Sequence, residues 1–330
     1  MIPDFFTPRP QWAAQIEQIV ELLGRVNALQ ERSGRVDELR RQHRIGSVQS
    51  SAAIEGNVLS VADVAAIAAG EHVIAPPRDV QEVKNLLDAY RAIDTLDPWD
   101  VDHFLHAHAL VSFDLVQESG AFRTVPVYIV GPKDDLLHTG ADSEAVPGLI
   151  RDLFAWGVAS EHHPLIVASA THFMIEHIHP FRDGNGRIGR LWQTLILSSW
   201  RPELAWLQAE TLIAERRQAY YDALQDSRKP VLDAKIFIDY MLSAITAALL
   251  TAEARARLIP PSGGINGGIN EAVLAVLRLD PTLTASALSV RLGKGQRTVE
   301  RALADLRAGG RLRREGSKKS GRWIVVEKES

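Results

Sequence analysis

The chain has 330 residues, which is long enough to bury a sizeable core and to form more than one domain. Its formal net charge is −4, with 46% hydrophobic and 24% charged residues, as in ordinary globular proteins. It has no cysteine, which excludes disulfides, thiolate metal sites and cysteine nucleophiles. We find no apolar run that reaches the roughly 18 residues needed to span a bilayer, and residues 1–12 lack a secretory-signal pattern. We therefore expect a cytoplasmic protein without a membrane partner.

The charge is unevenly distributed along the chain. Residues 270–330 hold 13 Lys and Arg against 7 Asp and Glu, a net charge of +6. The other 269 residues hold 24 against 34, a net charge of −10. A basic tail on an acidic body indicates two parts with different tasks.

Residues 1–95 are predicted to form an N-terminal helical region. Its first long segment has apolar residues at helical spacing: Ile16, Ile19, Val20, Leu22 and Leu23. Residues 164–178 and 234–258 follow the same spacing. Most of the chain before residue 258 is therefore predicted to be helical.

The stretch SSAAIEGN places Ser51 and Glu55 four positions apart, on one face of a helix predicted over about residues 47–57. Gly56 and Asn57 are typical of a helix stop. Taken alone, the simpler interpretation is a capped surface helix with one solvated glutamate.

Two later stretches precede the central motif. DHFLHAHAL contains His103, His106 and His108, but only Asp102 stands beside them, so no zinc site is predicted. GAFRTVPVYIVGP, residues 120–132, is rich in β-branched and aromatic residues and is interrupted by a proline. We predict a short edge hairpin, or flap, at this point.

The stretch HIHPFRDGNGRIGRLW, residues 177–192, joins two predicted helices. The first ends at Pro180, because the residue before a proline disfavours the helical region. The second begins near Gly186 or Arg187. Its core face is predicted from apolar residues at helical spacing: Ile188, Leu191, Trp192, Leu195 and Ile196.

The loop between these helices has the composition of a phosphate site. Arg187 and Arg190 lie in the first turn of the second helix, where the helix dipole disfavours cations unless an anion offsets them. Gly184, Asn185 and Gly186 allow backbone N–H groups to form an anion-binding concavity. The pattern predicts that this loop binds a chain of phosphates.

Two more residues suit a transfer reaction. Asp183 is a hard oxygen ligand of the kind that holds Mg²⁺ against substrate phosphates. His179 lies at the helix end and can act as a general base near neutral pH. Each feature alone is usually structural, but the combination at this spacing favours function.

The stretch LIPPSGGINGGIN predicts a linker over residues 258–269. Residues 270–330 are predicted to form three helices and a two-stranded hairpin, the order of a winged helix-turn-helix. The third of these helices has a core stripe of three apolar residues: Val299, Leu303 and Leu306.

Four cations of this tail are candidates for DNA contacts. Arg297 and Arg301 are predicted to face away from the core stripe, and Lys318 and Lys319 lie at the hairpin tip. Domains of this kind also bind proteins or brace a dimer, and that alternative stays open.

The motif HPFRDGNGRIGR, residues 179–190, resembles the Fic family motif HPFx[D/E]GNGRxxR at every specified position. The resemblance extends over most of residues 1–250, and it implies a catalytic core over residues 96–257. With the tail pattern, the predicted fold class is mainly α: a helical Fic domain with a short β-hairpin flap, followed by a small α+β winged helix-turn-helix domain.

Fic proteins typically transfer AMP from ATP to a hydroxyl side chain of another protein, so the resemblance implies ATP as substrate and Mg²⁺ as cofactor. His179 would deprotonate the target hydroxyl, Asp183 would hold Mg²⁺, and Phe181 would anchor the loop in the core. Five residues would hold the phosphates: Gly184, Asn185, Gly186, Arg187 and Arg190.

The resemblance also implies a wider nucleotide pocket. Tyr220 and Tyr221 match the family's nucleotide-pocket tyrosines, although Tyr220 suits a core position nearly as well. Val130 and Gly131 match flap positions that lie over the nucleotide. The flap would bind a segment of the target protein by strand addition.

The stretch around Ser51 and Glu55 resembles the family's inhibitory motif, [S/T]xxxE[G/N]. The implied mechanism is that Glu55 pairs with Arg190 in place of the γ-phosphate, so that ATP binds only in an unproductive pose. In some family members the same glutamate helps to remove AMP, and that role also stays open.

The predicted function is therefore that of an autoinhibited protein adenylyltransferase, expected as a homodimer. One alternative is a Fic-type transferase of another phosphate-containing group, which the mass added to the target would reveal. The other is a transcription regulator in which nucleotide gates DNA binding, whose activity would survive the loss of His179.

Overall fold

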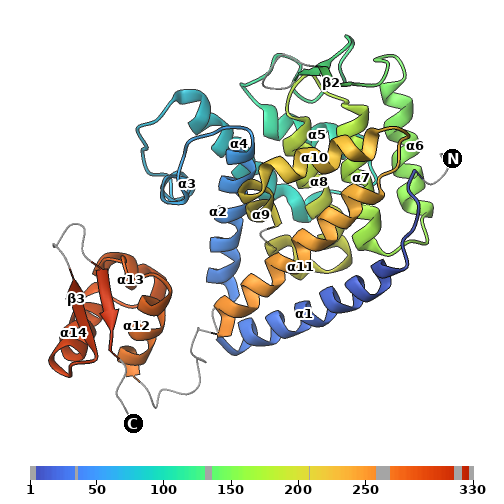
Figure 1. The fold of residues 1–330 in the computed structure, drawn as a ribbon. Helices are drawn as coiled ribbons and strands as arrows, with labels where there is room; N and C mark the ends of the chain where they lie inside the picture. Colours follow the sequence, from blue (N-terminus) through green and yellow to red (C-terminus); the bar gives the residue numbers. More distant parts are fainter. Residues whose placement is uncertain are drawn as a thin grey trace. The chain divides into compact units, whose positions relative to one another are not determined.

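The computed structural model describes residues 5–33, 36–130, 136–207, 209–257, 268–315 and 322–326, and they are mainly helical (Figure 1). By its internal contacts the chain divides into two compact units. The first comprises Met1–Gly24 and Asp37–Leu250, and the second Arg25–Val36 and Thr251–Ser330.

In the part of the chain that the structure describes, the flap is preceded by α1 (Gln11–Ser33), α2 (Val36–Ile54), α3 (Val61–Ala68), α4 (Pro77–Ala92), η1 (Ile93–Thr95) and α5 (Val101–Ser112). The predicted helix at 47–57 is the last part of α2, which starts earlier, with Asp37 and Glu38 in its first turn. It ends where predicted, because Gly56 takes a φ of 98° that favours glycine.

The flap hairpin lies later in the chain than predicted. Its strands, β1 (Tyr128–Val130) and β2 (Leu136–Thr139), pair antiparallel, and only β1 falls within residues 120–132. The preceding segment is held in an irregular path by Arg123, which donates to the carbonyl oxygens of Val125, Ala141 and His179. These side-chain bonds replace a strand ladder there.

The core of the first unit is built around α6 (Val146–Ala159), α7 (Pro164–Ile178) and α8 (Asn185–Trp200), and α7 and α8 pack together most extensively. The predicted apolar face of α8 is buried. On that face Trp192 stacks on Phe154, with ring centroids 5.7 Å apart. The position of the loop between α7 and α8 is thus fixed by the best-packed part of the unit.

The next elements after α8 are η2 (Pro202–Trp206), α9 (Ala209–Glu215), α10 (Arg217–Arg228) and α11 (Lys235–Arg257). By length and composition α11 could cross a membrane, which the sequence analysis did not anticipate. Half of its most apolar stretch is buried, and a buried core helix passes the same test.

The C-terminal elements are α12 (Gly268–Leu279), α13 (Ala285–Leu292), α14 (Gln296–Ala308), β3 (Leu312–Glu315) and β4 (Arg322–Val325). β3 and β4 pair antiparallel, and the helices share a core that includes the predicted stripe of α14. The order of elements agrees with the sequence analysis, and the winged-helix assignment remains a prediction. Residues 258–267 of the predicted linker lie outside the described residues.

Candidate active site

The loop from His179 to Gly184 reverses the chain between α7 and α8. It opens with His179 in the left-handed region (φ 54°, ψ 62°) and closes with Gly184 at φ 85°. Inside it, the Asn185 side chain accepts from the Phe181 N–H at 2.9 Å and donates to the Phe181 carbonyl at 2.8 Å. Asn185 therefore locks the loop with its side-chain oxygen and one of its two side-chain N–H donors.

Phe181 is fully buried and anchors the loop, and His108 covers its ring. The two rings stack 3.6 Å apart, at an angle of 3°. Nδ1 of His108 accepts from the Gly120 N–H at 3.0 Å, so Nε2 carries the proton and donates to the Asp183 carbonyl at 2.9 Å. Burial lowers the pKa of His108 to about 4, so the ring is neutral.

His179 presents one ring nitrogen as a base. Its Nδ1 lies 3.4 Å from the Glu176 carbonyl oxygen, and a proton on Nδ1 leaves the lone pair of Nε2 free. Burial, with a smaller contribution from Arg228, lowers the pKa of His179 to about 4. The imidazole is therefore neutral at pH 7 and can accept a proton.

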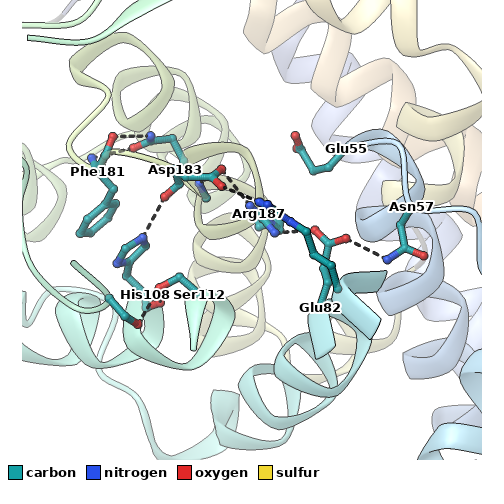
Figure 2. Close-up of polar contacts among 12 residues, drawn as sticks. Glu55, Asn57, Glu82, His108, Ser112, Phe181, Asp183 and Arg187 are labelled. Carbon is teal, nitrogen blue, oxygen red and sulfur yellow. Dashed lines mark hydrogen bonds and ion pairs between the residues drawn. The ribbon is translucent and has the colours of Figure 1, made fainter. Parts of the chain in front are cut away.

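Arg187 is buried between two carboxylates. Its Nη1 pairs with Glu82 of α4, and its Nη2 lies 2.9 Å from Oδ1 of Asp183 (Figure 2). Oδ2 of Asp183 lies 3.6 Å from the exposed Arg78. The sequence analysis did not anticipate Glu82, because it lies 105 residues before Arg187 and belongs to no recognisable motif.

Arg190 is also buried and paired. Its Nη2 lies 2.8 Å from Oε1 of Glu55 and donates to the Ser51 carbonyl at 3.1 Å, and its Nε donates to the Ser51 hydroxyl, also at 3.1 Å. Burial opposes the charged guanidinium, yet the attraction of Glu55 raises the pKa of Arg190 above its ordinary value. A Cβ on Gly186 would lie 2.5 Å from Glu55 Oε1, so any larger residue there would have to displace the carboxylate of this pair.

These contacts correct one step of the sequence analysis. The charges of Arg187 and Arg190 were expected to require phosphates, but carboxylates of the chain already offset both. Glu55, Glu82 and Asp183 supply three negative charges against two guanidinium groups. A phosphate would therefore have to replace one of these carboxylates.

The other predicted nucleotide residues are less closely gathered. Tyr220 is buried, and its hydroxyl lies 3.0 Å from Nε2 of His172, the arrangement expected of a core aromatic. Tyr221 is half-buried, with Arg217 over its ring. Val130 lies in β1, whereas Gly131 lies outside the described residues, as do Lys318 and Lys319 of the tail. On α14, Arg297 and Arg301 are exposed.

Asp183 is the candidate metal ligand. Its side chain is 45% exposed at the mouth of the loop. In the described part of the chain, no group of three or more His, Cys, Asp or Glu residues could hold a metal ion. A single accessible carboxylate fits Mg²⁺, which usually keeps several waters and is bound through one or two carboxylates and substrate phosphates.

Comparison with known proteins places this site in a family. Residues 96–197 match the family model described as the Fic/DOC family. The crystal structure of a Fic family protein from Desulfovibrio desulfuricans G20 is 31% identical in sequence, with a TM-score of 0.74 and 100% of both chains covered. A fragment of Fic-1 from Caenorhabditis elegans shares the fold, with a TM-score of 0.55 and 23% identity over 72% of this chain and 73% of that one.

Curated relatives are more distant. Protein adenylyltransferase Fic from Culex quinquefasciatus is 27% identical over 195 residues, which cover 55% of this chain and 36% of that protein. Protein adenylyltransferase fic-1 from Caenorhabditis elegans is 28% identical over 219 residues, which cover 61% and 40%. The chain thus spans about two fifths of the length of these relatives. On the full-length match to the Desulfovibrio protein, the chain belongs to the Fic family.

Proposed function

We propose that the protein is an autoinhibited adenylyltransferase, which moves AMP from ATP to a hydroxyl side chain of a target protein. The observation that carries the proposal is that a neutral His179 opens the loop leading to the N-terminus of α8, whose first two turns carry the buried Arg187 and Arg190. A base next to an anion-binding helix end is what phosphoryl transfer needs from a protein.

The phosphates of ATP would lie at the N-terminus of α8. The first N–H groups of a helix have no partner within it, and the helix dipole favours a negative charge there. Nε2 of His179 would take the proton of the target hydroxyl, whose oxygen would attack the α-phosphorus. The bond from that phosphorus to the bridging oxygen would break, and pyrophosphate would leave.

Asp183 would hold the Mg²⁺ that this reaction is expected to use. When bound, the ion would neutralise charge on the phosphates. Engagement of Asp183 by a cation would also remove one of the two carboxylates from Arg187, and leave that guanidinium freer to bind phosphate.

Glu55 would be the inhibitory residue, or brake, of the reaction. It occupies Nη2 of Arg190, which an intact triphosphate would need for its last phosphate. The Glu55 side chain is 32% exposed, whereas that of Arg190 is 1% exposed, so the glutamate is the partner that can move away. α2 ends at Ile54, so Glu55 lies in the turn that follows the helix.

The flap supports docking of an extended target segment. In the described residues, β1 and β2 pair only with each other, so each has a free edge. Tyr128 and Leu136 of these strands are exposed. A target strand could add to either edge and bring its hydroxyl near His179.

A second activity is supported only in the C-terminal unit. Arg297 and Arg301 are exposed on α14, one helical turn apart, while Val299 and Leu303 are buried on the other face. We propose that this winged-helix candidate binds the DNA backbone. The rival function, a regulator in which nucleotide only gates DNA binding, would not need His179.

Two labelled forms of ATP test the transferase. A Glu55→Gly variant is incubated with Mg²⁺ and ATP labelled in either the α- or the γ-phosphate, and protein-bound label is measured. Adenylyl transfer is expected to leave label only from the α-phosphate. Label from the γ-phosphate alone would instead establish phosphate transfer, and label from neither would contradict a transferase that uses ATP.

A further inference from the structure

Glu82 is a buried carboxylate that the proposed reaction does not use. It lies on α4, and its two oxygens have different partners. Oε1 pairs with Nη1 of Arg187, and Oε2 accepts from Nδ2 of Asn57 at 2.8 Å. Figure 2 shows Asn57, Glu82, Arg187 and Asp183 in one continuous row of polar contacts.

Asn57 belongs to the turn that carries the proposed brake. It follows Glu55 by two residues, and its side chain is fully engaged. Nδ2 donates to Glu82 and to the Asp79 carbonyl at 3.1 Å, while Oδ1 accepts from the Leu59 N–H at 3.0 Å. An amide that uses both its donors and its acceptor holds one orientation, so it fixes the turn after Glu55 on α4.

The two arginines of the site share a pattern of partners. Each has one buried partner from the N-terminal helices and one more exposed carboxylate. Arg187 has Glu82, with an 11% exposed side chain, and Asp183, with a 45% exposed one. Arg190 has the buried Ser51 and the partly exposed Glu55. The exposed carboxylates can be exchanged for phosphate, whereas the buried partners stay with the guanidinium groups.

We infer that Glu82 is a positioning residue of the nucleotide site. One of its carboxylate oxygens holds Arg187 in place to bind phosphate, and the other holds the turn after Glu55 in place through Asn57. The inference rests on the proposed function, since it assigns Arg187 to phosphate and Glu55 to inhibition. One buried carboxylate would thus join the phosphate site and the brake.

The chemistry requires an acidic residue at this position. Arg187 and Asn57 both present N–H donors, so the group between them must accept on both oxygens. A glutamine would place its own NH₂ against one of the two donors. Glu82→Gln is therefore expected to break one link while it keeps the size of the side chain, and Glu82→Asp keeps both acceptors on a shorter chain.

The positioning role is tested by nucleotide binding with the brake removed. In a Glu55→Gly background, Glu82→Gln is expected to weaken binding of a non-hydrolysable ATP analogue with Mg²⁺ by about tenfold, the worth of one charge-assisted hydrogen bond. Calorimetry measures the affinity, and Glu82→Asp should recover part of it. Asp88→Asn is the matched control, because Asp88 is an exposed carboxylate of the same helix that pairs with Arg91.

The outcomes separate this inference from the proposed function. If the Glu55→Gly parent binds the analogue and Glu82→Gln binds it equally well, Glu82 does not position Arg187 and the inference is wrong. If the parent itself binds no nucleotide, the proposed function fails and the inference falls with it. If Glu82→Gln does not fold, Glu82→Asp takes its place in the test. The inference then requires that Glu82→Asp bind the ATP analogue more weakly than the parent.

The seating role is tested by Asn57→Ala in the chain that retains Glu55. This change should release the turn and raise auto-modification about fivefold or more over wild type, since even one ordinary hydrogen bond is worth about 1 kcal/mol and Asn57 makes three. In the Glu55→Gly background it should add nothing, because Asn57 acts through Glu55. Unchanged auto-modification in the first case, or a further increase in the second, would overturn this part.

Discussion

Oε1 of Glu55 lies 2.8 Å from Nη2 of Arg190, on a guanidinium whose side chain is 1% exposed. The two residues are 135 positions apart, and Ser51, one helical turn before Glu55, binds the same guanidinium. A charge-assisted contact of this kind is worth roughly 1.5–3 kcal/mol. If it occupies the position of a phosphate, ATP must overcome that free energy before it can bind productively.

Glu55→Gly is therefore predicted to raise auto-modification by about tenfold or more, because 1.4 kcal/mol corresponds to a factor of ten in an equilibrium. Transfer of label from α-labelled ATP to the protein itself is the measurement. Glu315→Gln is a suitable control, since Glu315 pairs with Arg322 at 2.9 Å in β3 and β4 and has no part in the proposed site. Equal labelling of wild type and Glu55→Gly would contradict the proposal that Glu55 inhibits the reaction.

His179→Ala in the Glu55→Gly background is predicted to abolish transfer while the affinity for the ATP analogue stays within about threefold, because a general base acts in the chemical step. In the parent, kcat/KM should fall at acid pH as the imidazole is protonated. Since burial lowers the pKa of His179 to about 4, that fall should lie well below the ordinary histidine value. A midpoint near pH 6.5 would contradict a buried His179 with a lowered pKa as the titrating base.

Metal dependence is predicted to act through Asp183. Removal of Mg²⁺ with a chelator should abolish transfer by Glu55→Gly, and Asp183→Asn should require a higher Mg²⁺ concentration for the same affinity for the ATP analogue. Titration of Mg²⁺ at fixed analogue concentration is the measurement. If the Asp183→Asn curve coincides with that of the parent, the ion is not held by this residue.

Two buried histidines predict that the fold is less stable in acid. Burial lowers the pKa of His108 to about 4 and that of His172 to about 3, so above pH 6.5 both contribute their full stability. As the pH falls from 6.5 towards these values, the two histidines bind protons in the unfolded chain but stay neutral in the folded one. The free energy of unfolding then drops by about 1.4 kcal/mol per pH unit for each histidine.

His108→Gln tests this acid effect. The difference in unfolding free energy between pH 7 and pH 5, measured with urea, should be smaller in the variant by up to about 2 kcal/mol. Titrating groups common to both proteins cancel in this comparison. The same pH dependence in both proteins would show that His108 is not kept neutral by burial.

The C-terminal unit is predicted to bind DNA through its phosphate backbone. Arg297→Ala with Arg301→Ala in the full chain should weaken binding of a duplex of any sequence, and should reduce the slope of log affinity against log salt by about 1 for each phosphate that the variant no longer neutralises. A salt series of gel shifts measures this. Binding that is absent, or insensitive to both changes, would leave the unit with a protein-binding role.

The sequence predicted the parts of the site that depend on local pattern. The apolar spacing after Gly186 identified the buried face of α8, and the Gly-rich motif identified the reversal between α7 and α8. The resemblance brought Glu55 to Arg190, where the structure has it, and Ser51 of the same motif binds that guanidinium too. These features are encoded within a few turns of helix or in a recognisable motif.

The parts that were missed depend on tertiary contacts between ordinary residues. Glu82 lies in a plain amphipathic helix, and only the packing of α4 brings it to Arg187. His108 stood in a group of histidines that carried no metal pattern, and its role follows from contacts with Gly120 and Asp183. The offset of the flap hairpin has the same origin, because the bonds of Arg123 to distant carbonyls override a local preference for strand.

Intact-mass spectrometry after incubation with ATP and Mg²⁺ tests the central claim most directly. Glu55→Gly should gain the mass of one or more AMP groups, wild type should gain little, and Glu55→Gly with His179→Ala should gain none. A Glu55→Gly protein whose mass does not change, or one that gains the same mass without His179, would contradict the account.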